Sequence, residues 1–282
     1  MSYIEIANAD YGFADPGALM EKGRELHDAY VGAAPYPHIV IDDFISPAAL
    51  EACLADFPKA ADPDSQTFDR AQERYKTSYN PDHLSPRARS FFYALNSRPF
   101  VQLLENMTGI KGLIPDPHYL GGGFHETTQG GHLDIHADFN LHPLMKVERR
   151  LNLLIYLNKD WRPDYGGALE LWDTDMKGCV KSVTPAFGRC VVFSTDATSF
   201  HGHPAPVAHP RGQSRRSIAL YYYTATWDET KRRFTTQFKK RPRTDDRADW
   251  MVRSNELLDD FLPPILVRNI RRAARRLRRM AH

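Results

Sequence analysis

The first part of the chain shows helical patterns around a single clear strand. Asp15 followed by Pro16 is typical of a helix N-terminus, because an aspartate side chain caps free backbone amides and proline suits the first turn. We therefore predict a helix over residues 16–31. Residues 37–44 are rich in β-branched and apolar side chains and predict a strand. Ser46 and the proline after it then begin a second helix.

The pattern changes twice along the rest of the chain. Residues 60–88 are polar and without a clear period, and they predict a long irregular region. A helical stretch follows at about 86–108, and from about residue 118 short β-rich runs alternate with Gly, Pro and Asp. These runs cover residues 132–139, 151–157, 168–172, 190–193 and 217–223. Short strands at this spacing, with no helical pattern between them, indicate an antiparallel sandwich or barrel.

We expect one mainly β domain with flanking helices. Residues 1–117 are expected to form an N-terminal helical and supporting region, residues 118–227 the β core, and residues 228–282 a C-terminal helical extension. The chain has 282 residues, of which 42% are hydrophobic and 26% charged, which is typical of a globular protein with a sizeable core. No run approaches the roughly 18 consecutive apolar residues of a membrane-spanning helix, so we expect no such helix.

The cysteines and the N-terminus bear on where the protein works. Three cysteines without a C-x-x-C spacing argue against a disulfide framework and against a structural zinc site. We expect all three, Cys53, Cys179 and Cys190, to be small buried hydrophobes in a reducing cytoplasm. The N-terminus has early acidic residues and no basic segment, so we expect no secretory signal.

The charge of the chain is unevenly distributed. The net charge is +2, but residues 261–282 contain seven arginines and no acidic residue, so the 30 basic residues elsewhere face 35 acidic ones. The pattern predicts an amphipathic helix that would bind an anionic membrane surface or an acidic partner. A terminal helix packed on the domain is an equal alternative, and nothing supports a nucleic acid as partner. The arginines are Arg268, Arg271, Arg272, Arg275, Arg276, Arg278 and Arg279.

Two overlapping His-x-Asp pairs lie in the first β-rich run, His132 with Asp134 and His136 with Asp138. Because side chains alternate along a strand, we expect all four on one face. A histidine and an aspartate two positions apart can bind one metal ion from the same side. With a second histidine from a distant strand, the ligands would leave three coordination positions open, as non-haem Fe(II) oxygenases require.

Candidates for the remote histidine and for an anion-binding arginine occur further along. His201 and His203 lie in a short segment before the last β-rich run, which begins with Arg215, Arg216 and Ser217. Arg215 and Ser217 share one face of that strand and Arg216 the other, so only one arginine can point inward with the serine. The planar guanidinium suits a carboxylate, which it can bind through two hydrogen bonds.

With these residues in place, the sequence resembles the Fe(II)/2-oxoglutarate-dependent dioxygenases of the prolyl 4-hydroxylase-like branch. The similarity covers roughly residues 118–226, and the strand and helix near residue 40 also look like that branch. Within it, YLNKDW is nearly the string of oxygen-sensing prolyl hydroxylases. The matching segments are HADFN (136–140), LNLLIYLNKDW (151–161), GGALELWD (166–173), FGRCVVFSTDATSFHGHP (187–204) and RRSIALYYYT (215–224).

The resemblance implies a double-stranded β-helix, or jelly roll, that hydroxylates an unactivated C–H bond. The enzyme would use O2 and 2-oxoglutarate, release succinate and CO2, and use ascorbate as reductant. The substrate would be a prolyl residue, an amino acid, a lipid or another small molecule. Fe(II) would be bound by His136, Asp138 and His201, and 2-oxoglutarate by Arg215, assisted by Tyr156 and Ser217.

Several alternatives remain open from the sequence. His132, Asp134 and His203 are alternative metal ligands, and Asn152 shares the face of Tyr156, where it would line the pocket. The carboxylate of Asp138 favours hydroxylation over halogenation, because related halogenases need a small residue at that position. Two other functions are a zinc hydrolase or isomerase with the same ligands, and a non-catalytic β-barrel binding module.

Overall fold

A computed structural model of the chain describes residues 2–5, 13, 15–62, 64–83, 85–228 and 230–247. The chain divides into two compact units, Met1–Asp246 and Arg247–His282. The predicted arginine-rich helix therefore lies outside the described residues, in the second unit. Within the described residues, no helix is both long and apolar enough to cross a membrane.

Five α-helices form in the N-terminal part of the described chain. Two predicted helices form, but each is split in two. The first is interrupted at Leu26. In the stretch predicted over 86–108, the first helix ends at Leu95 and a second begins at Arg98, because Pro99 has no amide hydrogen to continue the first helix. The helices are α1 (Pro16–Glu25), α2 (His27–Val31), α3 (Pro47–Ala55), α4 (Pro86–Leu95) and α5 (Arg98–Thr108).

The predicted cap of α1 is confirmed. Asp15 Oδ1 accepts hydrogen bonds from the amides of Gly17 at 2.8 Å and Ala18 at 3.2 Å. We expect Asp15→Ala to lower the free energy of unfolding by about 1 kcal/mol, because these amides lose their acceptor. Asp15→Asn keeps an acceptor oxygen and should lose far less. Urea denaturation of both variants tests the cap, and equal losses would contradict it.

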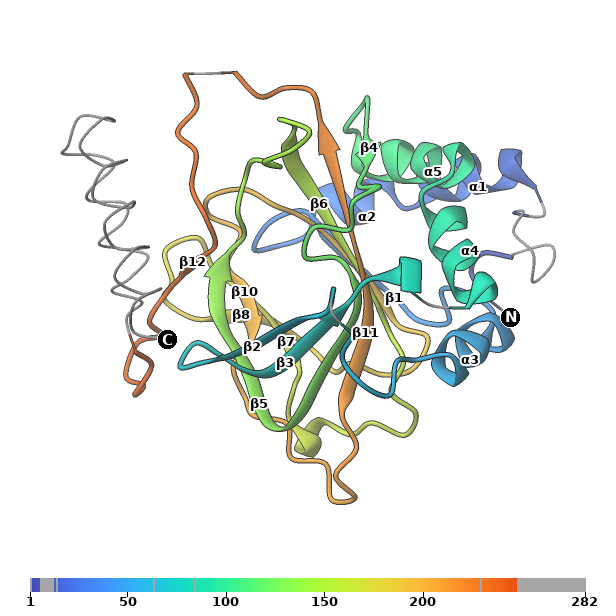
Figure 1. The fold of residues 1–282 in the computed structure, drawn as a ribbon. Helices are drawn as coiled ribbons and strands as arrows, with labels where there is room; N and C mark the ends of the chain where they lie inside the picture. Colours follow the sequence, from blue (N-terminus) through green and yellow to red (C-terminus); the bar gives the residue numbers. More distant parts are fainter. Residues whose placement is uncertain are drawn as a thin grey trace, which may run out of the picture. The chain divides into compact units, whose positions relative to one another are not determined.

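The described strands form one antiparallel sheet that rolls into a nearly closed barrel, the jelly roll predicted from the sequence (Figure 1). The order along the sheet is β1-β9-β6-β11-β5-β10-β7-β8, and the β2–β3 hairpin, β4 and β12 join it by pairing with β5 or β11. The strands are β1 (His38–Ile41), β2 (Gln66–Arg70), β3 (Glu73–Tyr79), β4 (Ile114–Pro115), β5 (Gly123–Ala137), β6 (Glu148–Tyr156), β7 (Leu169–Trp172), β8 (Cys179–Val183), β9 (Cys190–Ser194), β10 (His201–His203), β11 (Arg215–Thr224) and β12 (Gln237–Phe238).

Alternation along β6 and β11 separates the main core from the interior of the barrel. Leu153 of β6 and Leu220 of β11 pack with Phe92 and Leu103 of the helices in one buried cluster. The helices α1, α3, α4 and α5 gather on one side of the sheet (Figure 1). Side chains of the opposite face, such as Asn152, line a pocket inside the barrel. Burial of apolar side chains on the helical side thereby positions the polar side chains of the inner face.

Three expectations from the sequence are wrong. Residues 60–88 are not a long irregular region, because they contain the β2–β3 hairpin, whose β3 pairs with β5. Residues 230–247 contain no helix, and β12 in this segment pairs with the end of β5. Cys53 and Cys190 are buried as expected, but Cys179 is exposed on β8. The hairpin carries no clear hydrophobic pattern, because β2 has no buried residue and two of the three buried residues of β3 are the polar Glu73 and Ser78.

Candidate active site

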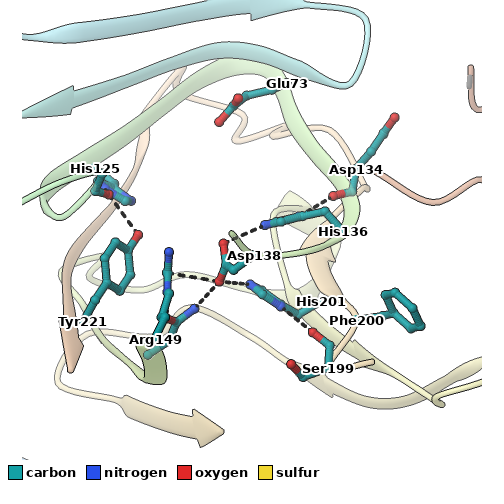
Figure 2. Close-up of polar contacts among 12 residues, drawn as sticks. Glu73, His125, Asp134, His136, Asp138, Arg149, Ser199, Phe200, His201 and Tyr221 are labelled. Atoms are coloured by element: carbon teal, nitrogen blue, oxygen red, sulfur yellow. Dashed lines mark hydrogen bonds and ion pairs between the residues drawn. The ribbon is translucent and has the colours of Figure 1, made fainter. Parts of the chain in front are cut away.

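Three side chains converge where β5 ends and β10 begins. His136 and His201 are directly opposite each other in the β5–β10 pairing, and Asp138 follows β5 immediately. One potential ligand atom from each lies within 4.8 Å of the others. His136 Nε2 is 3.6 Å from Asp138 Oδ1, and His201 Nε2 is 3.3 Å from Asp138 Oδ2 (Figure 2). Both imidazoles therefore face one carboxylate.

Backbone hydrogen bonds orient both histidine rings. His136 Nδ1 lies 2.9 Å from the carbonyl oxygen of Asp134, and His201 Nδ1 lies 3.0 Å from that of Ser199. A carbonyl oxygen only accepts, so each Nδ1 donates a proton to it, and Nε2 is the nitrogen that faces Asp138. Burial lowers the pKa of His201, which favours the neutral ring. Both rings thus present the nitrogen that a metal ion binds.

The carboxylate of Asp138 is held in its charged form. Burial by itself would raise the pKa of Asp138, but the neighbouring Arg149 guanidinium outweighs it and holds that pKa well below its usual range. Arg149 Nη2 is 3.1 Å from Asp138 Oδ2. Two imidazoles and one carboxylate are a donor set that suits Fe(II). The residues present therefore fit the metal that the sequence implies.

The structure does not bring His132, Asp134 or His203 into this group of potential ligands. His203 pairs with Leu133 while His201 pairs with His136, so β5 has one extra residue between the two pairs. This bulge interrupts the alternation expected along β5, and Leu133, rather than Asp134, lines the pocket. The Nε2 atom of His132 instead contacts the carbonyl oxygen of Ala71 at 3.2 Å. His203 lines the pocket beside the three convergent residues.

The three residues line a pocket of about 380 Å³ that also contains Arg215 and Ser217. Arg215 is only 4% exposed, and its Nε donates to the carbonyl oxygen of Gly167 at 2.7 Å. Its Nη2 is 3.4 Å from the hydroxyl of Tyr156, which lies behind it and does not itself line the pocket. Burial lowers the pKa of Arg215, and no carboxylate of the described residues forms an ion pair with it. A buried cation without an anion is a ready site for a ligand carboxylate.

Arg216 points away from this pocket, as alternation along β11 predicts. Its guanidinium pairs with Glu126, at 3.0 Å from Nη2 to Oε1, and lies over the ring of Phe57. Arg216 is therefore paired with a carboxylate and lies outside the pocket lining. Of these two arginines, Arg215 is the one that lines the pocket, and no carboxylate of the described residues forms an ion pair with it.

Sequence reasoning missed most of the pocket mouth. The β2–β3 hairpin contributes Phe68, and the segment before β12 contributes Arg233. Phe238 of β12 lies close to His136, with the ring centroids 5.4 Å apart. Neither segment carries a motif, and both reach the pocket only because β3 and β12 pair with β5.

Arg149 was also missed, although it is buried next to Asp138. Tyr222 of β11 pairs with Leu151 and Tyr223 pairs with Arg149, so β6 has an extra residue at Arg150. Counting two positions back from Asn152 would point Arg150 inward, but this bulge turns Arg149 inward instead. No local signal in the sequence marks the bulge.

Comparisons with known proteins agree with this geometry. Residues 122–223 match the model of the 2OG-Fe(II) oxygenase superfamily. The mouse protein "Prolyl 3-hydroxylase OGFOD1" is 35% identical over 79 residues, which are 27% of this chain and only 14% of that protein. The resemblance found in the sequence is thereby confirmed.

Two solved structures share the fold. One is a Pseudomonas putida prolyl-4-hydroxylase, with a TM-score of 0.50 and 17% identity, covering 72% of this chain and 98% of that one. The other is a Trichoplax adhaerens prolyl hydroxylase in complex with a hypoxia inducible factor peptide fragment. Its TM-score is 0.51 and its identity 17%, covering 73% of this chain and 91% of that one.

Proposed function

We propose a hydroxylase activity for this chain, whose residues 122–223 form a 2OG-Fe(II) oxygenase domain of the prolyl hydroxylase-like type. The reaction would couple oxidative decarboxylation of 2-oxoglutarate to hydroxylation of a C–H bond in a second substrate, with release of succinate and CO2. One observation carries this proposal. The pocket that contains His136, Asp138 and His201 also contains Arg215, a buried cation to which no described carboxylate is paired.

Different residues of the pocket would bind the metal and the co-substrate. His136, Asp138 and His201 would hold Fe(II), which supplies the oxidising chemistry with O2 when it is bound. Arg215 would bind the far carboxylate of 2-oxoglutarate, and the hydroxyl of Ser217 on the same strand face would assist. Tyr156 would act by orienting Arg215 through its hydroxyl, which burial keeps protonated by raising its pKa.

The substrate would enter through the mouth formed by the β2–β3 hairpin and the segment before β12. Aromatic side chains at this mouth, including Phe68 and Phe238, would cover the substrate and exclude water from the reacting atoms. The similarity to mouse prolyl 3-hydroxylase makes a prolyl residue the first candidate, with amino acids, lipids and other small molecules as alternatives. Ascorbate would serve as the reductant.

Neither other function suggested by the sequence accounts for Arg215. A zinc hydrolase with the same three ligands has no need of a dicarboxylic acid, and a non-catalytic binding module has no need of metal ligands. A zinc enzyme would also place a water, not a keto acid, in the open position. The arginine and the three ligands in one pocket therefore favour the oxygenase.

The proposal is tested by incubating the purified chain with Fe(II), ascorbate, O2 and 2-oxoglutarate, first without a substrate. We expect slow release of succinate that depends on both iron and O2, and that increases when a true substrate is added. Replacement of Fe(II) by Zn(II) should abolish it. Absence of succinate together with absence of 2-oxoglutarate binding would rule the proposal out, and hydrolysis with Zn(II) would favour the zinc enzyme.

A further inference from the structure

A buried hydrogen-bond network surrounds one oxygen of Asp138. Arg149 Nη2 lies 3.1 Å from Asp138 Oδ2, and Asn152 Nδ2 donates to the same oxygen at 2.7 Å. Asn152 Oδ1 in turn accepts from Arg149 Nε at 3.0 Å and from Nη2 at 2.7 Å. The three side chains thus form a closed triangle. Only one orientation of the amide satisfies it, because the oxygen must face the guanidinium and the nitrogen the carboxylate.

The guanidinium of Arg149 is fixed on its faces as well as along its edge. It lies 3.6 Å from the ring centroid of Tyr221 and 4.6 Å from that of Phe139. The hydroxyl of Tyr221 donates to the carbonyl oxygen of Gly121 at 2.9 Å, which anchors that ring (Figure 2). Only 2% of the Arg149 side chain is exposed. Arg149 is therefore part of the wall of the site and is directed at Asp138 rather than at the pocket mouth.

The network treats the two carboxylate oxygens differently. Oδ2 accepts a hydrogen bond from Asn152, forms an ion pair with Arg149 and lies 3.3 Å from His201 Nε2, whereas Oδ1 contacts neither Arg149 nor Asn152 and lies 3.6 Å from His136 Nε2. A carboxylate that rotates freely can bind a metal through either oxygen or through both. One whose second oxygen is held by an amide donor and a guanidinium ion has its other oxygen more readily available to a metal.

We propose that Arg149 and Asn152 are positioning residues that hold Asp138 so that it binds the metal through Oδ1 alone. This role rests on the iron site proposed above and goes beyond it, because Arg149 and Asn152 are not among the potential metal ligands. Their contribution is to set the direction of the Asp138 carboxylate before the metal arrives. Loss of such partners of a metal ligand typically weakens metal binding by about 10- to 100-fold.

The test is a metal titration of the full chain without 2-oxoglutarate, with binding of Mn(II) followed by electron paramagnetic resonance. We expect Arg149→Met to weaken Mn(II) binding by about 10- to 100-fold. Asn152→Ala should weaken it by a smaller factor, and the double variant by less than the product of the two, because the residues act on one oxygen. Arg149→Lys should recover part of the affinity, since lysine restores the charge but not the planar guanidinium that contacts Asn152 and Asp138 together.

Arg150→Ala is the matched control, because Arg150 is the neighbouring half-buried arginine and its side chain contacts Thr224 instead of Asp138. It should bind Mn(II) as the wild type does.

Melting temperatures measured without metal separate lost positioning from lost folding, and Asn152→Ala serves if Arg149→Met does not fold. Unchanged affinity in a folded Arg149→Met or Asn152→Ala variant, or an equal loss in Arg150→Ala, would overturn the positioning role alone. Absence of metal binding by the wild type would instead contradict the proposed function.

Discussion

Replacement of His201 by alanine should reduce succinate release from 2-oxoglutarate to the background seen without iron. The substitution removes one of two imidazoles whose Nε2 atoms face Asp138, and the opposite ring of His136 cannot take its place. His136→Ala should have the same effect. The visible charge-transfer band of the anaerobic Fe(II)/2-oxoglutarate complex gives a second measurement, and both variants should lose this band.

His132→Ala is the matched control, because His132 belongs to the other His-x-Asp pair on the same strand. Its ring contacts the backbone at Ala71 and does not line the pocket, so both turnover and the band should persist. The assignment of ligands would be incorrect if His132→Ala or His203→Ala removed the band while His201→Ala kept it.

Replacement of Arg215 by alanine should weaken 2-oxoglutarate binding about 10- to 150-fold. A hydrogen bond to a charged group contributes roughly 1.5–3 kcal/mol, and each 1.4 kcal/mol corresponds to about tenfold in affinity. Arg215 is buried and paired with no carboxylate of the described residues, so the ligand would supply its only anionic partner. The dissociation constant is measured anaerobically with the metal site filled by Mn(II), which avoids turnover.

Arg216 provides the control for this experiment. Its charge is neutralised by Glu126 on the other face of β11, so Arg216→Ala should leave 2-oxoglutarate affinity unchanged. Arg215→Lys should fall between wild type and Arg215→Ala, because lysine keeps the charge but cannot form two parallel hydrogen bonds. Equal losses in Arg215→Ala and Arg216→Ala would contradict a specific carboxylate site.

The β core and the inward direction of Arg215 were predictable because they depend on the two-residue period of a strand. That period is a local property of extended backbone, so the face on which a side chain lies follows from its position along the strand. It places Ser217 with Arg215 and Tyr156 with Asn152 once each strand is recognised. The cap at Asp15 was predictable for a similar reason, because its hydrogen bonds reach residues only two and three positions away.

The details of the candidate site depended on pairing between distant segments. A bulge in β5 turns Asp134 out of the pocket, and a bulge in β6 turns Arg149 toward Asp138. Each bulge is visible only as a mismatch against the partner strand, and the sequence of one strand does not contain it. The inward or outward direction of a side chain, when predicted by counting every second residue along β5 or β6, is therefore wrong beyond the bulge.

The sequence alone predicted the β core and the inward-facing arginine, because strand alternation is local. The jelly roll and the choice of His136, Asp138 and His201 came from the family resemblance of the ordered motifs, since alternation by itself left other ligands open. The tertiary structure decided how these residues are supported and enclosed. The β2–β3 hairpin and β12 become walls of the pocket only through pairing with β5. Asn152 meets Asp138 because the chain folds back after β5, where Leu141 is bridged to Glu148 at the start of β6. Polar strands carry little hydrophobic pattern, and contacts between separate segments carry none, so only the folded chain reveals them.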